Sequence, residues 1–241
     1  MSGTFLRAEW RKLIMAQYAV EAETLAPYLP AGTELDLWHG RCFVSLVGFL
    51  FDQVRVKGVA IPFHTRFEEI NLRFYVRRID ADGTSRRGVV FTREFTSKAA
   101  ITVVANALYE EPYATAPTRH AISQTAEALR VRYEWRHGGR WHSAGVEAAA
   151  LPVPIAEGSI EEFITEHYWG FTKRSDGGTS QYEVKHPRWE TYPITGWKID
   201  VDFGGLYGAE FAGLNRQEPE SVLLAEGSAV SVGSGSRLTV V

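Results

Sequence analysis

Three polar side chains that can do chemistry occur at every second position of one predicted strand. Glu69, Asn71 and Arg73 lie in residues 67–76, where polar and apolar residues alternate. Every second side chain of a strand points to the same face, about 7 Å from the next, so a carboxylate, an amide and a guanidinium would form one row. In a pocket, Glu69 would act as general base or acid, Arg73 would bind a carboxylate, and Asn71 would contact the ligand.

The same row is equally typical of the solvated face of an antiparallel sheet, and spacing alone does not separate the two interpretations. They differ in burial. In a pocket, Glu69 and Arg73 should be substantially buried. Each would then need a partner, from the other or from another strand, because an unpaired buried charge is costly. The opposite face, which carries Ile70, Leu72 and Phe74, should meet a hydrophobic core.

Two further titratable side chains lie near this strand. Lys98 follows the pair Arg93–Glu94 and is a candidate amine nucleophile; the alternative is a surface lysine at the start of a helix. Arg93 and Glu94 point to opposite faces of their strand, so at most one faces a pocket, and a cross-strand ion pair is the simpler interpretation. His64 lies on a proline-led loop, a position that suits a ligand-binding residue or a solvated histidine.

A histidine beside aromatic residues is another candidate. In residues 166–169, His167 and Trp169 would share one face if this segment is a strand. Aromatic rings supply apolar area in ligand pockets, and histidine supplies a proton that titrates near neutral pH. The alternative is a buried histidine that is hydrogen-bonded to the backbone. Arg11 is a second candidate for binding a ligand carboxylate.

The sequence contains no pattern that indicates a metal or a cofactor. It has no His-x-His or His-Glu-x-x-His spacing, and the glycine pairs at 177–178 and 204–205 lack the strand-then-helix context of dinucleotide binding. The single cysteine, Cys42, begins an apolar run and is predicted to be a core residue. We therefore expect neither a metal nor a cofactor.

Composition favours a globular protein with a small-molecule partner. The chain has 241 residues, of which 45% are hydrophobic, and a net charge of −3, which argues against a surface for nucleic acid or an anionic membrane. No apolar run approaches the roughly 18 residues of a membrane span, and polar residues interrupt the N-terminal segment where a cleavable signal would lie. We expect a cytoplasmic protein that binds neither nucleic acid nor membrane; its oligomeric state is left open.

Many short strands and glycine-containing turns predict a mostly β fold of the α+β type, with a few short helices. The helices are expected at residues 21–29, at 99–109 behind Ser97 as cap, and at 159–165, where Ser159 and Glu162 form a capping box. Hairpins are expected for residues 34–37 with 42–54, and for 69–78 with 88–96. The remaining strands are expected at residues 8–18, 129–135, 140–148, 168–174, 179–185, 188–194, 197–202, 221–225 and 229–232. We expect one domain over residues 1–233 and a flexible tail over 234–241.

Several separate segments resemble the YqjF-like family, known as domain of unknown function 2071. They are residues 8–11, 25–34, 44–49, 67–73, 165–170 and 223–228. The resemblance spans nearly the whole chain. It implies an acetoacetate-decarboxylase-like fold, in which a curved antiparallel sheet forms a partly closed barrel, and it implies no activity.

The distantly similar enzyme, acetoacetate decarboxylase, uses a lysine Schiff base, and its amine needs a depressed pKa. The resemblance implies that Glu69 matches the catalytic glutamate of that enzyme. Its Pro-Lys-Lys run falls near residues 108–112, where this chain has Glu110 and Glu111 and no lysine. Three functions stay open. One is an enzyme acting on a small carbonyl or keto-acid compound without that lysine, and another is a non-catalytic small-ligand binding protein. A structural role with a filled interior is a third.

Overall fold

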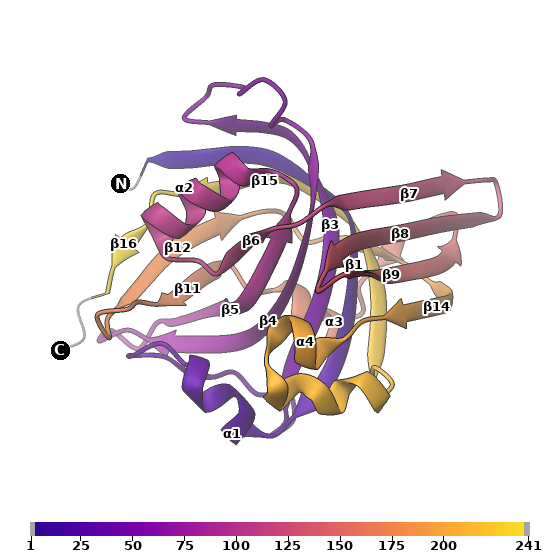
Figure 1. The fold of residues 1–241 in the computed structure, drawn as a ribbon. Helices are drawn as coiled ribbons and strands as arrows, with labels where there is room; N and C mark the ends of the chain where they lie inside the picture. Colours follow the sequence, from indigo (N-terminus) through magenta and orange to yellow (C-terminus); the bar gives the residue numbers. More distant parts are fainter. Residues whose placement is uncertain (1–2, 239–241) are drawn as a thin grey trace.

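Strands make up most of the regular structure, as the sequence predicts. The fold is that of a computed structural model, and residues 3–238 are described (Figure 1). Within these residues the strands form a larger sheet of twelve strands and a smaller sheet of four. None of the helices in this part of the chain has the length and apolar character that a membrane crossing requires.

The larger sheet is strongly curved (Figure 1). Its central antiparallel strands are, in order, β15 (Ser221–Gly233), β1 (Thr4–Val20), β3 (Cys42–Val56), β4 (Phe67–Ile79) and β5 (Ser85–Thr96). β11 (Trp169–Lys173) continues the sheet parallel to β5, and β12 (Thr179–Lys185) is antiparallel to β11. Because β12 also pairs with β15, the hydrogen-bonded path returns to the strand where it began.

Short strands and helices complete this layer. The short strands are β2 (Glu34–Leu35), β6 (Tyr113–Thr115), β10 (Val153–Pro154), β13 (Glu190–Tyr192) and β16 (Ser236–Arg237). The helices are α1 (Ala22–Leu25), η1 (Ala26–Tyr28), α2 (Ala99–Tyr109), α3 (Ile160–Thr165), α4 (Phe203–Tyr207) and η2 (Ala209–Arg216).

The smaller sheet packs against one face of the larger sheet. Its strands are, in order, β14 (Ile194–Asp200), β9 (Arg140–Ala149), β8 (Ala128–His137) and β7 (Thr118–Gln124). One hydrophobic cluster joins the two sheets: Leu72 and Phe74 of β4 belong to it together with Tyr133 and Trp135 of β8. Cys42 is buried in the same cluster, so its prediction as a core residue is confirmed.

Strand β4 lies between two hydrophobic clusters. Ile70 and Leu72 face the cluster between the sheets, whereas Phe67 and Tyr75 belong to a second cluster on the other face of the strand. The alternation predicted for residues 67–76 is therefore confirmed. Because the side chains of a strand have a period of two, this register alone decides which residues reach each side.

The hairpin predicted for residues 34–37 with 42–54 is wrong. β2 pairs with β4 instead, with Leu35 opposite Val76. The reason is that a strand has two edges, and both edges of β3 are occupied, by β1 and by β4. The predicted hairpin of β4 with β5 is confirmed.

The predicted strands at residues 221–225 and 229–232 are one continuous strand, β15. Gly227, which separates them, has a φ of +81°. A Cβ atom at this position would lie 1.9 Å from the carbonyl oxygen of Trp10. Glycine is the residue that accepts both the positive φ and the close approach, so it sustains a strand here instead of ending it.

Capping differs between the predicted helices. Ser159 accepts a hydrogen bond from the backbone N–H of Glu162 at 3.2 Å, so its prediction as the cap of α3 is confirmed. The cap predicted at Ser97 is wrong, because α2 has Lys98 as its N-cap residue, with no side-chain cap bond. The segment predicted as a flexible tail contains the strand β16, which pairs with β12; residues 239–241 lie outside the described part.

The packing between the sheets yields a stability prediction. Trp135 is fully buried between them, so Trp135→Ala should lower the free energy of unfolding by about 3–5 kcal/mol. Trp197→Ala, in β14 of the same sheet, is the matched control. Because Trp197 is 41% exposed, its replacement should lower the free energy of unfolding by less than about 1 kcal/mol. Urea unfolding followed by far-ultraviolet circular dichroism measures both. Equal costs would contradict this packing.

Candidate active site

The larger sheet encloses a cavity of about 250 Å³. Its lining comes from β1, β3, β4, β5, β11, β12 and α2, and most of it is apolar or aromatic. Trp10, Phe49, Phe51, Trp169 and Trp189 are among the aromatic lining residues. Polar side chains form a smaller part of the lining, and they include the row predicted on β4.

The predicted row faces this cavity. Glu69, Asn71 and Arg73 all line it, and the side chains of Glu69 and Asn71 are buried. The alternative of a solvated face is therefore wrong. Whether these residues act on a ligand stays a prediction.

Two more glutamates join Glu69. Glu94 lies on β5 opposite Asn71, and Glu111 lies in the link between α2 and β6. We call Glu69, Glu94 and Glu111 the carboxyl cluster. All three line the cavity, with exposed fractions of 3%, 1% and 8%.

Hydrogen bonds from three side chains hold the carboxyl cluster. The Tyr113 hydroxyl donates to Glu69 Oε2 at 2.6 Å, and Asn71 Nδ2 donates to Glu69 Oε1 at 3.1 Å. The Tyr182 hydroxyl donates to Glu111. β6 brings Tyr113 into place by pairing with β5 in parallel, where Tyr113 lies opposite Glu94.

Gly170 makes room for one of these tyrosines. It lies opposite Tyr182 in the β11–β12 ladder, and a Cβ atom at this position would lie 2.2 Å from the Tyr182 ring. A larger residue would displace the ring and with it the Tyr182 hydroxyl that donates a hydrogen bond to Glu111.

Burial dominates the electrostatics of the cluster. Desolvation raises the pKa of Glu69 to about 6, although the bonds from Tyr113 and Asn71 oppose the shift. It raises the pKa of Glu111 to about 7, and the nearby charge of Glu69 adds to this. The pKa of Glu94 is raised well above its usual range, by desolvation first and then by the charges of Glu111 and Glu69. The cluster therefore keeps protons near neutral pH, and Glu69 is its most readily ionised member.

Arg73 is less enclosed than predicted. It is half-buried, and its Nη2 donates to the carbonyl oxygen of Ile164 at 3.4 Å. Within residues 3–238 it forms no ion pair with Glu69, whose hydrogen-bond partners are Tyr113, Asn71 and Glu94. Its Nε atom is buried and has no hydrogen-bond partner in the described part of the chain.

His167 lines the cavity, but not as a strand residue. Glu166 follows α3 as its C-cap residue, and β11 begins at Trp169, so the condition that residues 166–169 form a strand is not met. The strand predicted at residues 168–174 is confirmed as β11. The buried His167 ring lies with Nε2 3.0 Å from Asp36 Oδ2, and Arg87 Nε donates to the same oxygen at 2.6 Å. The alternative of a histidine bonded to the backbone is therefore also wrong. Desolvation lowers the pKa of His167 to about 4, so the ring is neutral near pH 7.

The other predicted site residues divide into two groups. His64 and Trp169 line the cavity, and His64 Nδ1 lies 2.8 Å from the carbonyl oxygen of Pro62. Lys98 does not line it, because it precedes α2 at the N-cap position. The other lysines, at positions 12, 57, 173, 185 and 198, are also absent from the lining.

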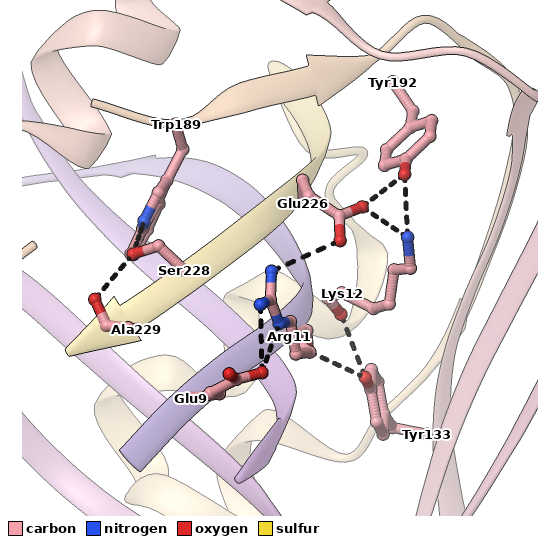
Figure 2. A network of polar contacts seen from close by, with 9 residues as sticks. All are labelled: Glu9, Arg11, Lys12, Tyr133, Trp189, Tyr192, Glu226, Ser228 and Ala229. Atoms are coloured by element: carbon pink, nitrogen blue, oxygen red, sulfur yellow. Dashed lines mark hydrogen bonds and ion pairs between the residues drawn. The ribbon is translucent and has the colours of Figure 1, made fainter. Parts of the chain in front are cut away.

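Arg11 belongs to a different network, outside the cavity lining (Figure 2). Its Nε donates to Glu9 Oε2 at 3.0 Å, and its Nη1 lies 3.5 Å from Glu226 Oε1. Glu226 also pairs with Lys12, whose carbonyl oxygen accepts a 2.9 Å bond from the Tyr133 hydroxyl of the smaller sheet. These contacts join β1 and β15 to β8, so Arg11 contributes to the architecture and does not meet Glu69.

Several residues of the site were not predicted from the sequence. Cross-strand ion pairs were the simpler expectation for Arg93 and Glu94. Instead, Glu94 lines the cavity, and Arg93, on the opposite face, donates to the carbonyl oxygen of Leu206 at 2.7 Å. The only signal for Glu111 was that it lies near the position where the similar enzyme has its Pro-Lys-Lys run. Tyr113 and Tyr182 had no sequence signal, because their partners are distant along the chain.

No group of three His, Cys, Asp or Glu side chains in the described ranges has the arrangement needed to hold a metal ion. The chemistry that these residues can support is proton transfer and hydrogen bonding. The cluster contains both ionisable and proton-holding carboxyl groups, and apolar walls limit their access to water.

Comparison with known proteins agrees with this architecture. Solved structures with similar folds include acetoacetate decarboxylase from Legionella pneumophila, with a TM-score of 0.65 and 13% identity over 99% of this chain and 88% of that one. An acetoacetate decarboxylase-like enzyme from Sphingomonas wittichii has a TM-score of 0.66 and 13% identity, over 99% and 95% of the two chains. The enduracididine biosynthesis enzyme MppR, complexed with pyruvate, has a TM-score of 0.64 and 12% identity, over 99% and 92%. The predicted acetoacetate-decarboxylase-like fold is confirmed.

Sequence relatives define the family more closely. The uncharacterized protein YqjF of Bacillus subtilis is 23% identical over 168 residues, which are 69% of this chain and 67% of that protein. The model of the family DUF2071, described as an uncharacterized conserved protein, matches residues 7–229. The chain therefore belongs to the DUF2071 family of uncharacterized conserved proteins.

Proposed function

We propose that this protein is an enzyme that removes and returns a proton at the carbon beside the carbonyl group of a small compound bound in the cavity. In this proposal, carboxyl groups act in place of a Schiff-base lysine. The observation that carries the proposal is the carboxyl cluster of Glu69, Glu94 and Glu111, buried in an otherwise mostly apolar cavity. Perturbed carboxyl groups in a cleft are typical of sites for acid–base catalysis.

Glu69 is the base in this proposal. Its pKa of about 6 is the lowest in the cluster, so it is the member that ionises near neutral pH. A base whose pKa lies near the working pH is both available and strong enough to take a proton from the carbon beside a carbonyl group. The bonds from Tyr113 and Asn71 orient its carboxylate.

Arg73 binds the carbonyl oxygen in this proposal. Its Nε has no partner in the described residues, and it lines the same cavity as Glu69. A guanidinium there would stabilise the negative charge that develops on the oxygen when the proton leaves. The fold neighbours support the substrate class in one respect: MppR is described in complex with pyruvate, a small carbonyl compound.

Deuterium exchange tests the proposal directly. Small ketones and keto acids with apolar side groups are incubated with the protein in heavy water, and proton NMR follows the hydrogens beside the carbonyl group. We expect accelerated exchange with at least one compound, and a rate about 100-fold lower for Glu69→Gln, the loss typical of removing a general base. Glu68→Gln is the matched control, because Glu68 lies on the opposite face of β4 and bonds to Thr118.

Three results would contradict the proposal or its assignment of Glu69 as the base. Equal exchange by wild type and Glu69→Gln would exclude Glu69 as the base. Binding of the compounds without exchange would favour the non-catalytic ligand-binding function. Loss of exchange in Glu68→Gln, with its fold intact, would place the chemistry elsewhere.

Borohydride reduction separates this mechanism from a Schiff base. Pyruvate and acetoacetate are incubated with the protein and sodium borohydride, and intact mass spectrometry follows the product. We expect no stable adduct, because no lysine lines the cavity within residues 3–238. A stoichiometric adduct on Lys98 or any other lysine would show that an amine reaches the substrate.

The protons held by the cluster make stability depend on pH. The pKa of Glu111 is about 7 in the folded protein against 4.5 for an ordinary glutamate. Its contribution to stability is therefore fully present below pH 4.5 and is lost as the pH rises through 7. Between pH 4.5 and 7, the free energy of unfolding of the wild type should fall by roughly 1–3 kcal/mol more than that of Glu111→Gln.

Urea unfolding at several pH values measures this difference. His167 has a lowered pKa and acts in the opposite direction, but it is present in both proteins and cancels in the comparison. Glu110→Gln is the control, because the Glu110 carboxylate bonds to Ser175 outside the cavity and should follow the wild type between pH 4.5 and 7. Parallel curves for wild type and Glu111→Gln would show that Glu111 does not hold a proton.

A further inference from the structure

Several buried polar atoms around the cavity have no hydrogen-bond partner in the described part of the chain. They are Trp10 Nε1, Asn71 Oδ1, Arg73 Nε, Glu94 Oε1 and His167 Nδ1, and all five residues line the cavity. Buried polar atoms in folded proteins nearly always have partners, so a ligand in the cavity would find these five atoms free to form hydrogen bonds.

Two of these atoms are oxygens of residues that neighbour each other across β4 and β5. Asn71 and Glu94 are directly opposite in the β4–β5 ladder, and both side chains are 1% exposed. Directly opposite side chains have Cβ atoms about 5 Å apart. One polar group of a ligand can therefore reach both oxygens, provided that it carries more than one hydrogen to donate.

The charge of this part of the cavity favours a cation. Glu94 interacts with Glu69 and Glu111, so three carboxyl groups face one another, and the half-buried Arg73 is directed toward the carbonyl oxygen of Ile164. A ligand carboxylate would add a further acidic group to this buried cluster, and its charge would raise the pKa values of the cluster still more. A cation would replace the protons that otherwise keep the carboxyl groups neutral.

The walls of the cavity suit the rest of such a ligand. Trp10, Trp169 and Trp189 line it together with Phe49 and Phe51. Aromatic faces attract cations and also provide apolar surface for a hydrocarbon body.

We propose that the ligand is a small amine that is protonated in solution, with an apolar or aromatic body, and that its ammonium group binds between Asn71 and Glu94, with Glu111 as a further counter-charge. This deepens the proposed function and rests on it in one respect: the substrate would be a carbonyl compound that carries an amino group. Glu69 and Arg73 would act on the carbonyl, and Glu94 and Asn71 would hold the amine.

Binding of the ammonium group should release a proton. The cluster holds protons near neutral pH, and a carboxyl group must ionise to form an ion pair with the ligand. The proton passes to the solvent, and the ligand keeps its own charge. Affinity should therefore rise with pH while the amine stays protonated.

Isothermal titration calorimetry with three probes of the same shape tests this. Phenethylammonium, phenethyl alcohol and hydrocinnamate carry an ammonium, a hydroxyl and a carboxylate group on the same phenyl body. We expect the ammonium to bind at least about tenfold more tightly than the alcohol, the carboxylate to bind most weakly, and the ammonium affinity to rise from about pH 6 to about pH 8. Titrations in buffers of different ionisation enthalpy should show up to one proton released.

Variants locate the binding group. Glu94→Gln keeps the shape of the side chain and removes its ability to ionise, so it should abolish the preference for the ammonium over the alcohol. Glu110→Gln should retain the wild-type preference. Thermal melting checks that each variant folds; if Glu94→Gln does not, proton release and the pH dependence in the wild type decide the question.

The proposal is overturned if the alcohol or the carboxylate binds as tightly as the ammonium, or if the ammonium binds without releasing a proton. None of the probes contains a carbonyl group, so their binding does not depend on turnover. Exchange on simple ketones without ammonium binding would refute only this inference. Ammonium binding without exchange on any ketone would refute only the proposed proton transfer.

Discussion

Desolvation of the three carboxyl groups is the constraint on which the rest of the site depends. A single unpaired carboxylate in an apolar cavity is costly, and Glu69, Glu94 and Glu111 lie together. The protein offsets this cost in two ways. Tyr113 and Tyr182 donate hydrogen bonds to the cluster, and the carboxyl groups keep protons to higher pH than usual. The second way makes the cluster chemically useful, because groups that hold protons near neutral pH can also exchange them.

The β4 strand positions this chemistry. One of its faces packs between the two sheets, and the other carries Glu69 and Asn71 into the cavity. A shift of register by one residue would bring Ile70 and Leu72 into the cavity and force the carboxylate into the hydrophobic core between the sheets. The pairing of β4 with β3 and β5 therefore fixes both the core and the site, and Tyr133 and Trp135 of the smaller sheet support it from behind.

The likeness to acetoacetate decarboxylase is a likeness of fold. The sheets superimpose over nearly the whole chain at 13% identity, which supports a common architecture. Here the cavity is lined by glutamates, and none of the lysines of this chain lines it. A fold of this kind supplies an enclosed cavity, and the side chains that reach it decide the chemistry. Both proposals, for proton transfer and for a cationic ligand, follow from the side chains that line this cavity.

Local patterns in the sequence determined the mostly β fold, the two faces of β4, the cap of α3 and the burial of Cys42, because each depends on neighbours a few residues away. The family resemblance added the overall architecture. Only the tertiary structure decided that Glu111 and Tyr182, 71 residues apart, meet in the cavity, and that Arg11 and Lys98 do not reach it. It also placed Glu94 beside Asn71 and paired β2 with β4. These outcomes depend on which strands become neighbours in a curved sheet, and the alternation along one strand carries no information about that choice.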